Sequence, residues 1–259
     1  MGDDIFELKG KSAVVTGGSR GIGLMIAGGL VKAGVRVFIS SRKAEVCDEV
    51  AANLSKDGEC ISIPADLSTA SGIEHLSSEL ASQSPELHIL VNNAGTAWGA
   101  PLEEYPPESF NKVWAVNVQA PFHLTQKLLP QLKAAASAED PARVINIGSI
   151  DGLRVPALEN YAYSASKAGI HQLSRHMASA LVGHFITVNA IAPGLFPSRM
   201  TKFMFETDGA EQALASAIPL QRVGRPDDMA GTVIFLSSRA GSYVTGAVIP
   251  VDGGAATLR

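Results

Sequence analysis

Short runs of mostly hydrophobic residues alternate along the chain with longer stretches of mixed polarity. The runs are rich in β-branched residues, and several are hydrophobic at nearly every position, as expected for parallel strands buried on both faces. The expected strands are Ser12–Thr16, Arg36–Ser40, Cys60–Pro64, Ile89–Asn92, Arg143–Ile147, Thr187–Ala192 and Val248–Val251. The expected helices are Gly21–Ala33, Ala44–Lys56, Thr69–Gln83, Ser109–Leu132, Tyr161–Leu181 and Pro226–Ser237.

Strands that alternate with helices indicate βαβ units, which predict the α/β class. We expect a Rossmann-like, doubly wound parallel sheet of about seven strands with helices on both faces. No linker, repeat or low-complexity tract divides the 259 residues. The sequence therefore predicts a single catalytic domain over residues 1–259.

Two regions, about 150–160 and 195–219, do not fit the alternation. Both follow expected strands, and ligands bind at the carboxyl ends of strands in an open α/β sheet. We interpret them as substrate loops, although a mobile surface loop is the alternative. In the second region, large apolar side chains favour a lid with an apolar inner face. They are Phe196, Met200, Phe203, Met204 and Phe205.

A glycine-rich turn, Thr16-Gly-Gly-Ser-Arg-Gly-Ile-Gly23, joins the first expected strand to the first helix. Glycines let the backbone approach a pyrophosphate, and the helix N-terminus offers free N–H groups. A tight strand-to-helix connection is the alternative, but the position favours a dinucleotide site. The residues expected to hold the cofactor here are Gly17, Ser19, Arg20, Gly21, Ile22 and Gly23.

The end of the second strand indicates which dinucleotide binds. An acid there would hydrogen-bond the ribose of NAD, but the sequence reads Ser40-Ser41-Arg42. A guanidinium matches a phosphate well, so Arg42, with Arg20 and Ser41, favours NADP(H). Alternatively, Arg42 is simply a solvated residue at the start of the next helix.

The third and fourth strands end in further candidates for the cofactor site. Asp66 and Leu67 are expected at the adenine pocket, although Asp66 could equally cap the helix that follows. The run Asn93-Ala94-Gly95 has small residues that let the backbone pass close to the cofactor. For the preceding Asn92, a structural role is as plausible as a ligand role.

Tyr163 and Lys167 lie four residues apart in an expected helix, which places both side chains on one face. A phenol has a pKa near 10, and a neighbouring cation favours the phenolate. The pair therefore suggests an acid–base centre, with a plain surface contact as the alternative. Tyr161 could compete for the role, but it has Ala165 four residues further on and no cation.

These motifs together resemble the short-chain dehydrogenase/reductase family over nearly the whole chain, from Lys9 to Gly254. Each motif alone is weak, but the ordered set is specific. The set consists of the turn from Thr16 to Gly23, Asn92-Asn93-Ala94-Gly95, Asn117, Ser149, Tyr163-x-x-x-Lys167 and Pro193-Gly194.

The resemblance implies a role for each member of the set. Tyr163 would donate the proton in carbonyl reduction, and Lys167 would lower its pKa and hold the nicotinamide ribose. Ser149 would bind the substrate oxygen, and Asn117 would hold a water that links Lys167 to solvent. The nicotinamide would be bordered by Pro193, Gly194 and Phe196.

Within this family, the chain looks most like the 3-oxoacyl-thioester reductases of the rhamnolipid-associated type. That implies NADPH-dependent reduction of a 3-oxo group to a 3-hydroxy group on a hydrophobic substrate. One alternative is a carbonyl reductase or alcohol dehydrogenase for small ketones, sugars or polyols. A more remote one is a non-catalytic NADP-binding regulator, which would not need the complete Asn/Ser/Tyr/Lys set.

The acyl group could be carried on an acyl carrier protein, carried on coenzyme A, or free. An acidic carrier protein needs a basic docking patch. The candidates do not form a dense cluster in the sequence, and they are Arg154, Arg175, His176 and Arg199.

Composition excludes several other classes of protein. The net charge is −4 with no Lys/Arg run, so a nucleic-acid partner is not expected. Two cysteines and scattered histidines form no metal-binding spacing. The chain start lacks a signal-peptide core and no apolar run could cross a bilayer, so we expect a cytoplasmic protein.

Assembly is predicted from the resemblance, which implies a homotetramer built on neighbouring long helices. Small side chains on the Tyr/Lys helix permit close packing, within the core or between subunits. They are Ala165, Ala168, Gly169, Ala178 and Ala180.

Overall fold

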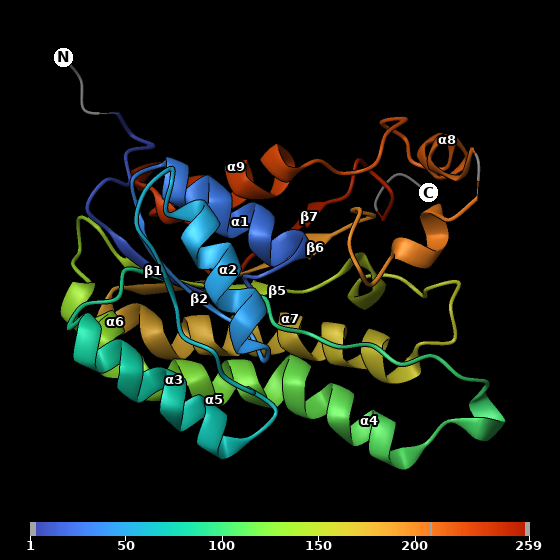
Figure 1. Cartoon of the computed structure of the whole chain (residues 1–259), viewed down its shortest axis with the longest axis horizontal. Coiled ribbons are helices and arrows are strands. Elements are labelled where there is room, and N and C mark those ends of the chain that lie inside the picture. The colour runs from blue at the N-terminus through green and yellow to red at the C-terminus, as the bar shows by residue number, and fades with distance from the viewer. Residues whose placement is uncertain (1–3, 208, 257–259) are drawn as a thin grey trace.

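A computed structural model of the chain describes residues 4–207 and 209–256, and its strands form one parallel sheet. The strand order is β3-β2-β1-β4-β5-β6-β7, with every neighbouring pair parallel. In Figure 1 the strands lie between two layers of helices. The strands are β1 (Ser12–Thr16), β2 (Arg36–Ser40), β3 (Cys60–Ser62), β4 (Ile89–Asn92), β5 (Ala142–Ile147), β6 (Ile186–Pro193) and β7 (Val248–Val251). The predicted doubly wound fold is therefore confirmed.

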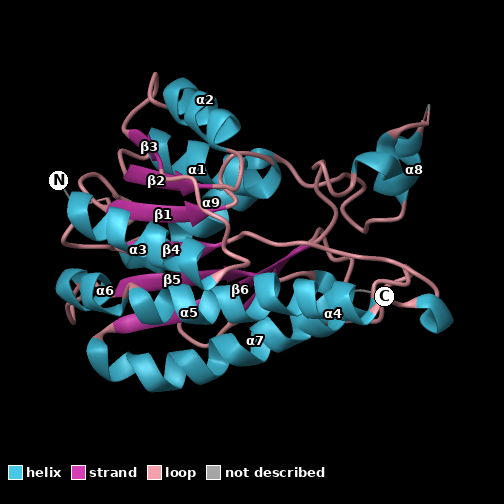
Figure 2. Cartoon of the chain, turned by 60° about the horizontal axis from the view of Figure 1, so that its bottom comes forward, coloured by secondary structure: helices cyan, strands magenta, loops and turns pink. Residues whose placement is uncertain are grey.

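Helices cover both faces of the sheet, as Figure 2 shows. They are α1 (Gly21–Lys32), α2 (Ala44–Leu54), α3 (Ala70–Gln83), α4 (Pro107–Trp114), α5 (Ala120–Lys127), α6 (Leu129–Ala135), α7 (Tyr161–Leu181), α8 (Ala210–Ser216) and α9 (Pro226–Ser237). Buried residues of α1, α2 and α9 pack in one core cluster. Those of α3, α5, α6 and α7 pack in the other.

The two clusters lie on opposite faces of the sheet because successive strand residues point to opposite sides. In β1, Val15 belongs to the cluster under α1, and its neighbour Val14 belongs to the cluster under α7. Both are fully buried. A strand with apolar side chains on both faces is stable only when both faces are covered, which explains the continuous hydrophobic runs.

The expected helix over Ser109–Leu132 differs from the structure, which divides it into α4, a π-helical turn over Ala115–Gln119, α5 and α6. Pro121 contributes to the division because it has no N–H for the helical ladder. The α-helical hydrogen bond that would end on the Asn117 carbonyl therefore cannot form. A widened turn accommodates that loss, and such turns are frequent at functional sites.

The order of the strands reverses between β1 and β4, which are neighbours although β2 and β3 separate them in the sequence. Ligands of open α/β sheets bind at such a switch point, beyond the carboxyl ends of the strands. The glycine-rich turn after β1 and the Asn-rich segment after β4 thus lie side by side. Within the described residues, no helix is long and apolar enough to cross a membrane.

Candidate active site

The glycine-rich turn forms a tight backbone cradle between β1 and α1. Gly17 has a φ of +65°, in the left-handed region that favours glycine. A Cβ on Gly23 would lie 2.2 Å from the Gly17 carbonyl oxygen, so no larger residue fits there. The Asn93 side chain closes the turn by donating a hydrogen bond to the Thr16 carbonyl at 2.8 Å. The turn therefore has the shape that a pyrophosphate requires.

Positive charge gathers beside this cradle. Burial and the charges of Arg199 and Arg42 lower the pKa of the Arg20 guanidinium, which means that three arginines lie near one another. None of the three appears in an ion pair within the described part of the chain. At the same end of β2, the Ser41 hydroxyl is buried without a hydrogen-bond partner among the described residues. This arrangement suits a phosphate, which accepts hydrogen bonds and carries negative charge.

Asp66 follows β3 and lies within range of the Arg42 charge. The Ser68 hydroxyl and backbone N–H donate hydrogen bonds to its carboxylate at 2.7 Å and 3.0 Å. Burial alone would raise the pKa of Asp66, but these bonds and the positive charges of Arg42 and Lys112 hold it below its ordinary value. The alternative of a helix cap fails, because Thr69 caps α3 by accepting from the Gly72 N–H at 3.0 Å. The adjacent Leu67 side chain is buried in the core.

The two asparagines after β4 have different environments. Asn92 is buried and donates to Asn146 at 2.9 Å, which supports the structural role for Asn92. Asn93 faces the glycine-rich turn, and the N–H groups of Asn93 and Ala94 both donate to the Thr16 hydroxyl at 2.9 Å. The backbone from Asn93 to Gly95 is thereby held against the cradle.

Ser149, Tyr163 and Lys167 converge at the carboxyl end of β5. Ser149 follows that strand, and both other residues lie in α7, whose observed bounds match the predicted ones. The Lys167 ammonium is buried, donates to the Ile147 carbonyl at 2.7 Å and lies 5.5 Å from the centre of the Tyr163 ring. The structure therefore brings together the three residues that the sequence separates by up to eighteen positions.

The pKa of Tyr163 differs from the expected direction. Burial raises it to about 12, whereas the Ser149 hydroxyl acts in the opposite direction and the charge of Asp151 raises it further. Burial likewise lowers the pKa of Lys167 to about 8. Desolvation of the phenolate is the largest cause, so the pKa of Tyr163 lies above that of an ordinary phenol rather than below it as the sequence predicted, while the role of Lys167 stays a prediction. At neutral pH the phenol keeps its proton and can act as an acid.

Asn117 lies in the π-helical turn, buried beside this centre. Its amide donates to Ser166 at 2.9 Å and to the Thr96 carbonyl at 2.9 Å, and it accepts from the Thr96 N–H at 2.9 Å. These three bonds occupy the side chain. Its backbone carbonyl has no α-helical donor, because Pro121 four residues further on has no N–H.

The end of β6 carries the residues expected to border a nicotinamide. Gly194 donates to the Val251 carbonyl at 3.0 Å, which fixes the turn after Pro193. The Phe196 side chain is 2% exposed and packs in the core against Gly224. Any contact of Phe196 with a cofactor must therefore come through its backbone.

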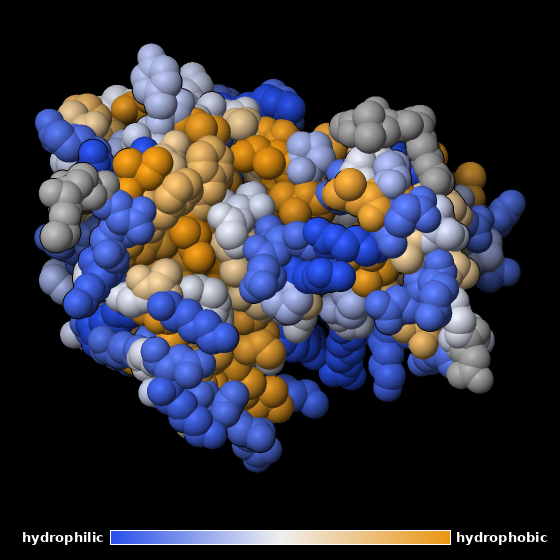
Figure 3. Space-filling view, turned by 90° about the horizontal axis from the view of Figure 1, so that it is seen from above, coloured by the Kyte–Doolittle hydropathy of each residue, from blue (hydrophilic) through white to orange (hydrophobic). Residues whose placement is uncertain are grey.

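The 195–219 region folds as short helical pieces, a 3-10 turn over Lys202–Phe205 and α8, with residue 208 outside the described part. Its apolar residues do not share one face. Phe196 is buried, whereas Met200 and Phe203 are exposed. On the molecular face seen in Figure 3, hydrophobic side chains lie in patches among hydrophilic ones rather than as one continuous surface. The region touches the cradle at one point, since a Cβ on Gly21 would lie 3.3 Å from the Ser198 side chain.

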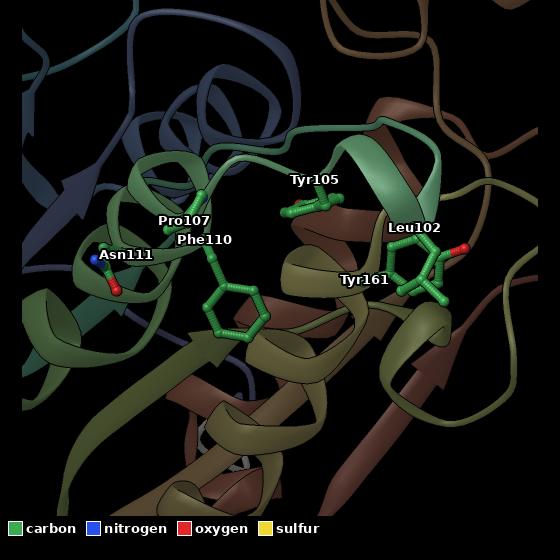
Figure 4. Close-up of a pocket in the computed structure, with 6 residues that line it drawn as sticks. All are labelled: Leu102, Tyr105, Pro107, Phe110, Asn111 and Tyr161. Carbon is green, nitrogen blue, oxygen red and sulfur yellow. The ribbon is translucent and has the colours of Figure 1, made fainter.

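An aromatic cavity of about 350 Å³ opens beside the first turn of α7 (Figure 4). Tyr105 makes edge-on ring contacts with Phe110 and Tyr161, with centroids 6.3 Å and 5.7 Å away. Tyr161 is exposed and hydrogen-bonded to Glu159 rather than to the catalytic cluster. This placement supports Tyr163 over Tyr161 as the acid.

Comparisons with known proteins agree with this geometry. A family model described as enoyl-(acyl carrier protein) reductase matches residues 17–256. A rhamnolipids biosynthesis 3-oxoacyl-[acyl-carrier-protein] reductase from Pseudomonas aeruginosa is 54% identical over 249 residues, which cover 96% of this chain and 97% of the relative. The chain belongs to the short-chain dehydrogenase/reductase family. It is therefore an oxidoreductase.

Other members of the short-chain dehydrogenase/reductase family are also similar. The solved structure described as the Pseudomonas aeruginosa RhlG/NADP active-site complex has a TM-score of 0.94 and 53% identity, with 97% of this chain and 98% of that chain covered. A 5-keto-D-gluconate 5-reductase from Escherichia coli is 33% identical over 258 residues, which cover 97% of this chain and 98% of the relative.

Sequence reasoning missed two charged residues near the site. Arg199 was expected at a carrier-docking patch, yet its charge acts on Arg20 at the cofactor cradle. Asp151 carried no expectation, although its charge acts on Tyr163. The expected absence of a metal site stays a prediction, and the described residues contain no group of three metal-binding side chains.

Proposed function

We propose that this protein is an NADPH-dependent reductase that converts the 3-oxo group of a 3-oxoacyl thioester to a 3-hydroxy group. The observation that carries the proposal is the convergence of Ser149, Tyr163 and Lys167 at the switch-point edge of the sheet, next to the glycine cradle. The 54% identity to a reductase named for a 3-oxoacyl substrate supports that substrate class.

The residues present fit NADP(H). The cradle at Gly17 and Gly23 would hold the pyrophosphate, and Arg20, Arg42 and the unpartnered Ser41 hydroxyl would hold the 2′-phosphate. The bound reduced nicotinamide supplies a hydride to the carbonyl carbon. Adenine would lie against Asp66, the Leu67 backbone and the Ala94-Gly95 segment.

Protein side chains would stabilise the substrate carbonyl oxygen and donate its proton. As negative charge develops on that oxygen, the Ser149 hydroxyl donates a hydrogen bond to it and the Tyr163 hydroxyl transfers its proton. The buried Lys167 cation stabilises the resulting phenolate. The raised pKa of Tyr163 supports this direction, because the phenol must carry its proton before the reaction begins.

Proton resupply would follow from the neighbouring Asn117. In our proposal, Asn117 holds a water that connects the Lys167 ammonium to solvent. The Asn117 side chain fixes the turn through its bonds to Thr96 and Ser166. Each turnover would then restore the Tyr163 proton through Lys167.

The proposal is tested by measuring NADPH oxidation with a 3-oxoacyl thioester, an unsubstituted ketone of the same length and 5-keto-gluconate. We expect the thioester to give the highest kcat/KM. A higher value with 5-keto-gluconate would favour the sugar alternative, which the 33% identical relative represents. No carbonyl-dependent oxidation with any substrate would favour the non-catalytic alternative.

Replacing Arg42 by Ala should weaken NADPH binding about 10- to 100-fold, the usual worth of a hydrogen bond to a charged group. The Kd for NADH should change little, because NADH has no 2′-phosphate. Both constants can be measured by fluorescence titration. Arg36→Ala is the matched control, since Arg36 lies at the other end of β2 and pairs with Glu59. Equal weakening of NADPH and NADH would contradict the assignment.

We also propose that the chain works in the cytoplasm as a homotetramer. Two buried free cysteines, Cys47 and Cys60, suit a reducing compartment. The exposed side chains of Ala165 and Ala168 on α7, with the exposed Phe122 on α5, suit helix packing between copies. Light scattering coupled to size exclusion measures the mass, and a monomer would contradict the assembly.

A further inference from the structure

His171 is a buried side chain that α7 presents to the turn after β5. It follows Tyr163 by eight residues and Lys167 by four, a spacing that places the three side chains along one side of the helix. Lys167 donates to the carbonyl of Ile147, the last residue of β5, at 2.7 Å. Two residues further on, the Ser149 N–H donates to Nε2 of His171 at 3.5 Å. The same side of α7 therefore binds the backbone both where β5 ends and where the following turn begins.

The imidazole ring fits against this backbone because residue 148 is a glycine. A Cβ on Gly148 would lie 2.0 Å from Nε2 and 2.6 Å from Cδ2 of His171, so a larger residue would leave no room for the ring. His171 is 2% exposed. A ring that is packed this closely has few alternative positions, so the position of Nε2 relative to the turn is well defined.

The ring is an acceptor at neutral pH. Burial, followed by the charges of Lys167 and Arg175, lowers the pKa of His171 to about 4, so the ring is neutral. The Gly152 backbone, the smallest of these causes, acts in the opposite direction but is not within hydrogen-bond geometry of Nδ1. Because the Ser149 N–H needs a lone pair on Nε2, the ring proton is assigned to Nδ1. The contact with Ser149 is thus the hydrogen bond that the ring makes among the described residues.

Ser149 is the residue that this contact holds. Its N–H donates to His171, its carbonyl accepts from the Gly152 N–H at 3.0 Å, and its hydroxyl accepts from the Asp151 N–H at 3.1 Å. Gly152 and Asp151 belong to the same short turn as Ser149. Of the three bonds, only the one to His171 joins Ser149 itself to α7, the helix that carries Tyr163.

We propose that His171 is a positioning residue for Ser149, which it holds at the place where the Ser149 and Tyr163 hydroxyls meet one carbonyl oxygen. The inference rests on the proposed function, in which Ser149 stabilises negative charge on that oxygen. Such a donor is effective only when it is preorganised, and a displacement of about 1 Å can cost on the order of 10²-fold in rate. A second tie, from the Ser164 hydroxyl to the Asp151 carbonyl at 2.8 Å, holds the turn two residues further on. Loss of the His171 acceptor should therefore loosen Ser149 without releasing the whole turn.

The test is a double-mutant cycle on the single-turnover rate constant, measured with saturating NADPH and the N-acetylcysteamine thioester of 3-oxohexanoic acid. His171→Leu removes the acceptor and keeps a side chain of similar size. We expect it to lower the rate constant by about tenfold or more in the wild type, but by less than about twofold in Ser149→Ala, which has no hydroxyl to position. Equal falls in both proteins, or no fall in the wild type, would overturn the proposal.

His171→Gln and His171→Asn separate the acceptor from the ring. The Gln side-chain oxygen can occupy the position of Nε2, whereas the shorter Asn carries its oxygen near the position of Nδ1. We expect Gln to stay within about threefold of the wild-type rate constant and Asn to lose about as much as Leu. A folded Gln variant that is as slow as Asn contradicts a role for the acceptor. Thermal unfolding shows which variants are folded, and the cycle is run with Asn if Leu is not.

His88→Leu is the matched control. Nδ1 of His88 accepts from the N–H of Ser12, the first residue of β1, at 3.2 Å. Both histidines thus accept a backbone N–H at the end of a strand, but His88 lies at the amino edge of the sheet, opposite the catalytic cluster. We expect His88→Leu to lower the unfolding temperature and to leave the rate constant within about twofold of the wild type. A loss as large as that of His171→Leu would show general loosening of the sheet and would count against a specific role for His171.

Ser149→Ala distinguishes failure of this inference from failure of the proposed function. If the wild type reduces the thioester and Ser149→Ala keeps the wild-type rate constant, the role proposed for Ser149 is wrong and the inference fails with it. If Ser149→Ala loses about 10²-fold and His171→Leu loses nothing, only the positioning role is wrong. If the wild type reduces 5-keto-gluconate and not the thioester, the proposed substrate is wrong, and the same cycle with 5-keto-gluconate then decides the role of His171.

Discussion

Tyr163→Phe is expected to reduce kcat for ketone reduction by a factor on the order of 10²–10⁴, the usual contribution of a positioned acid. The substitution removes only the hydroxyl, so the ring keeps its place near the Lys167 ammonium, 5.5 Å from the ring centre in the wild type. The remaining groups are poor substitutes for the phenol: Ser149 is a much weaker acid, Tyr161 is bonded to Glu159 away from the cluster, and the Lys167 ammonium donates to the Ile147 carbonyl. Single-turnover measurements with NADPH and the ketone isolate this step.

Binding should change far less than catalysis in Tyr163→Phe. The glycine cradle and the arginines near it do not depend on the phenol, so the Kd for NADPH should stay within a few-fold of the wild-type value. Tyr161→Phe is the matched control, because it removes the same atom from the same helix two residues earlier. If Tyr161→Phe loses activity and Tyr163→Phe keeps it, the proton donor has been assigned to the wrong tyrosine.

The elements that position the site follow closely from local sequence. The bounds of β1, β2, β4 and α7 match the predicted ones, because each is an uninterrupted hydrophobic run or a regular amphipathic stretch with clear ends. The glycine-rich turn is equally local, because its conformation requires glycine at Gly17 and Gly23, where a Cβ would clash with neighbouring atoms. Such features do not depend on distant contacts, and a pattern along the chain is enough to find them.

Other features of the site depend on three-dimensional contacts that no local pattern encodes. The π-helical turn at Asn117 divides the expected helix, although the amphipathic pattern continues through it. Pro121 is the only local feature of the sequence that indicates this division. Arg199 reaches the cradle from a loop without periodicity. The raised pKa of Tyr163 arises from burial, which becomes visible only when α7 packs against β5 and its following turn.

Phe196 illustrates why residue type alone can mislead. An aromatic residue after the Pro193-Gly194 turn is a reasonable neighbour for a nicotinamide, yet its ring fills the space above Gly224 in the core. Burial of a large aromatic side chain is strongly favourable, and here the core provides the space. The same burial anchors the start of the 195–219 region, so the exposed part of that region begins only after Phe196.

Lys167→Met is expected to lower kcat by a factor on the order of 10² or more, because the cation that stabilises the developing phenolate is lost. Folding should survive the change. The pKa of Lys167 is about 8 in the native protein against 10.5 for an ordinary lysine, so below pH 8 the buried charge costs ~3 kcal/mol of stability. Met removes that cost, although it leaves the Ile147 carbonyl without its donor, a loss of about 1–3 kcal/mol. The two effects nearly cancel at pH 7.

The pH dependence of the free energy of unfolding distinguishes the cost of the buried Lys167 charge from a simple change in packing. Because the unfolded lysine binds its proton more tightly than the native one, the free energy of unfolding of the wild type rises as pH increases from about 8 toward 10.5. The variant lacks this contribution, so its stability relative to the wild type should fall across that window in urea unfolding. Lys127→Met, which removes an exposed lysine paired with Glu74, should show neither the activity loss nor this trend. If Lys167→Met keeps more than about a tenth of wild-type activity, the buried cation is not what stabilises the phenolate during proton transfer.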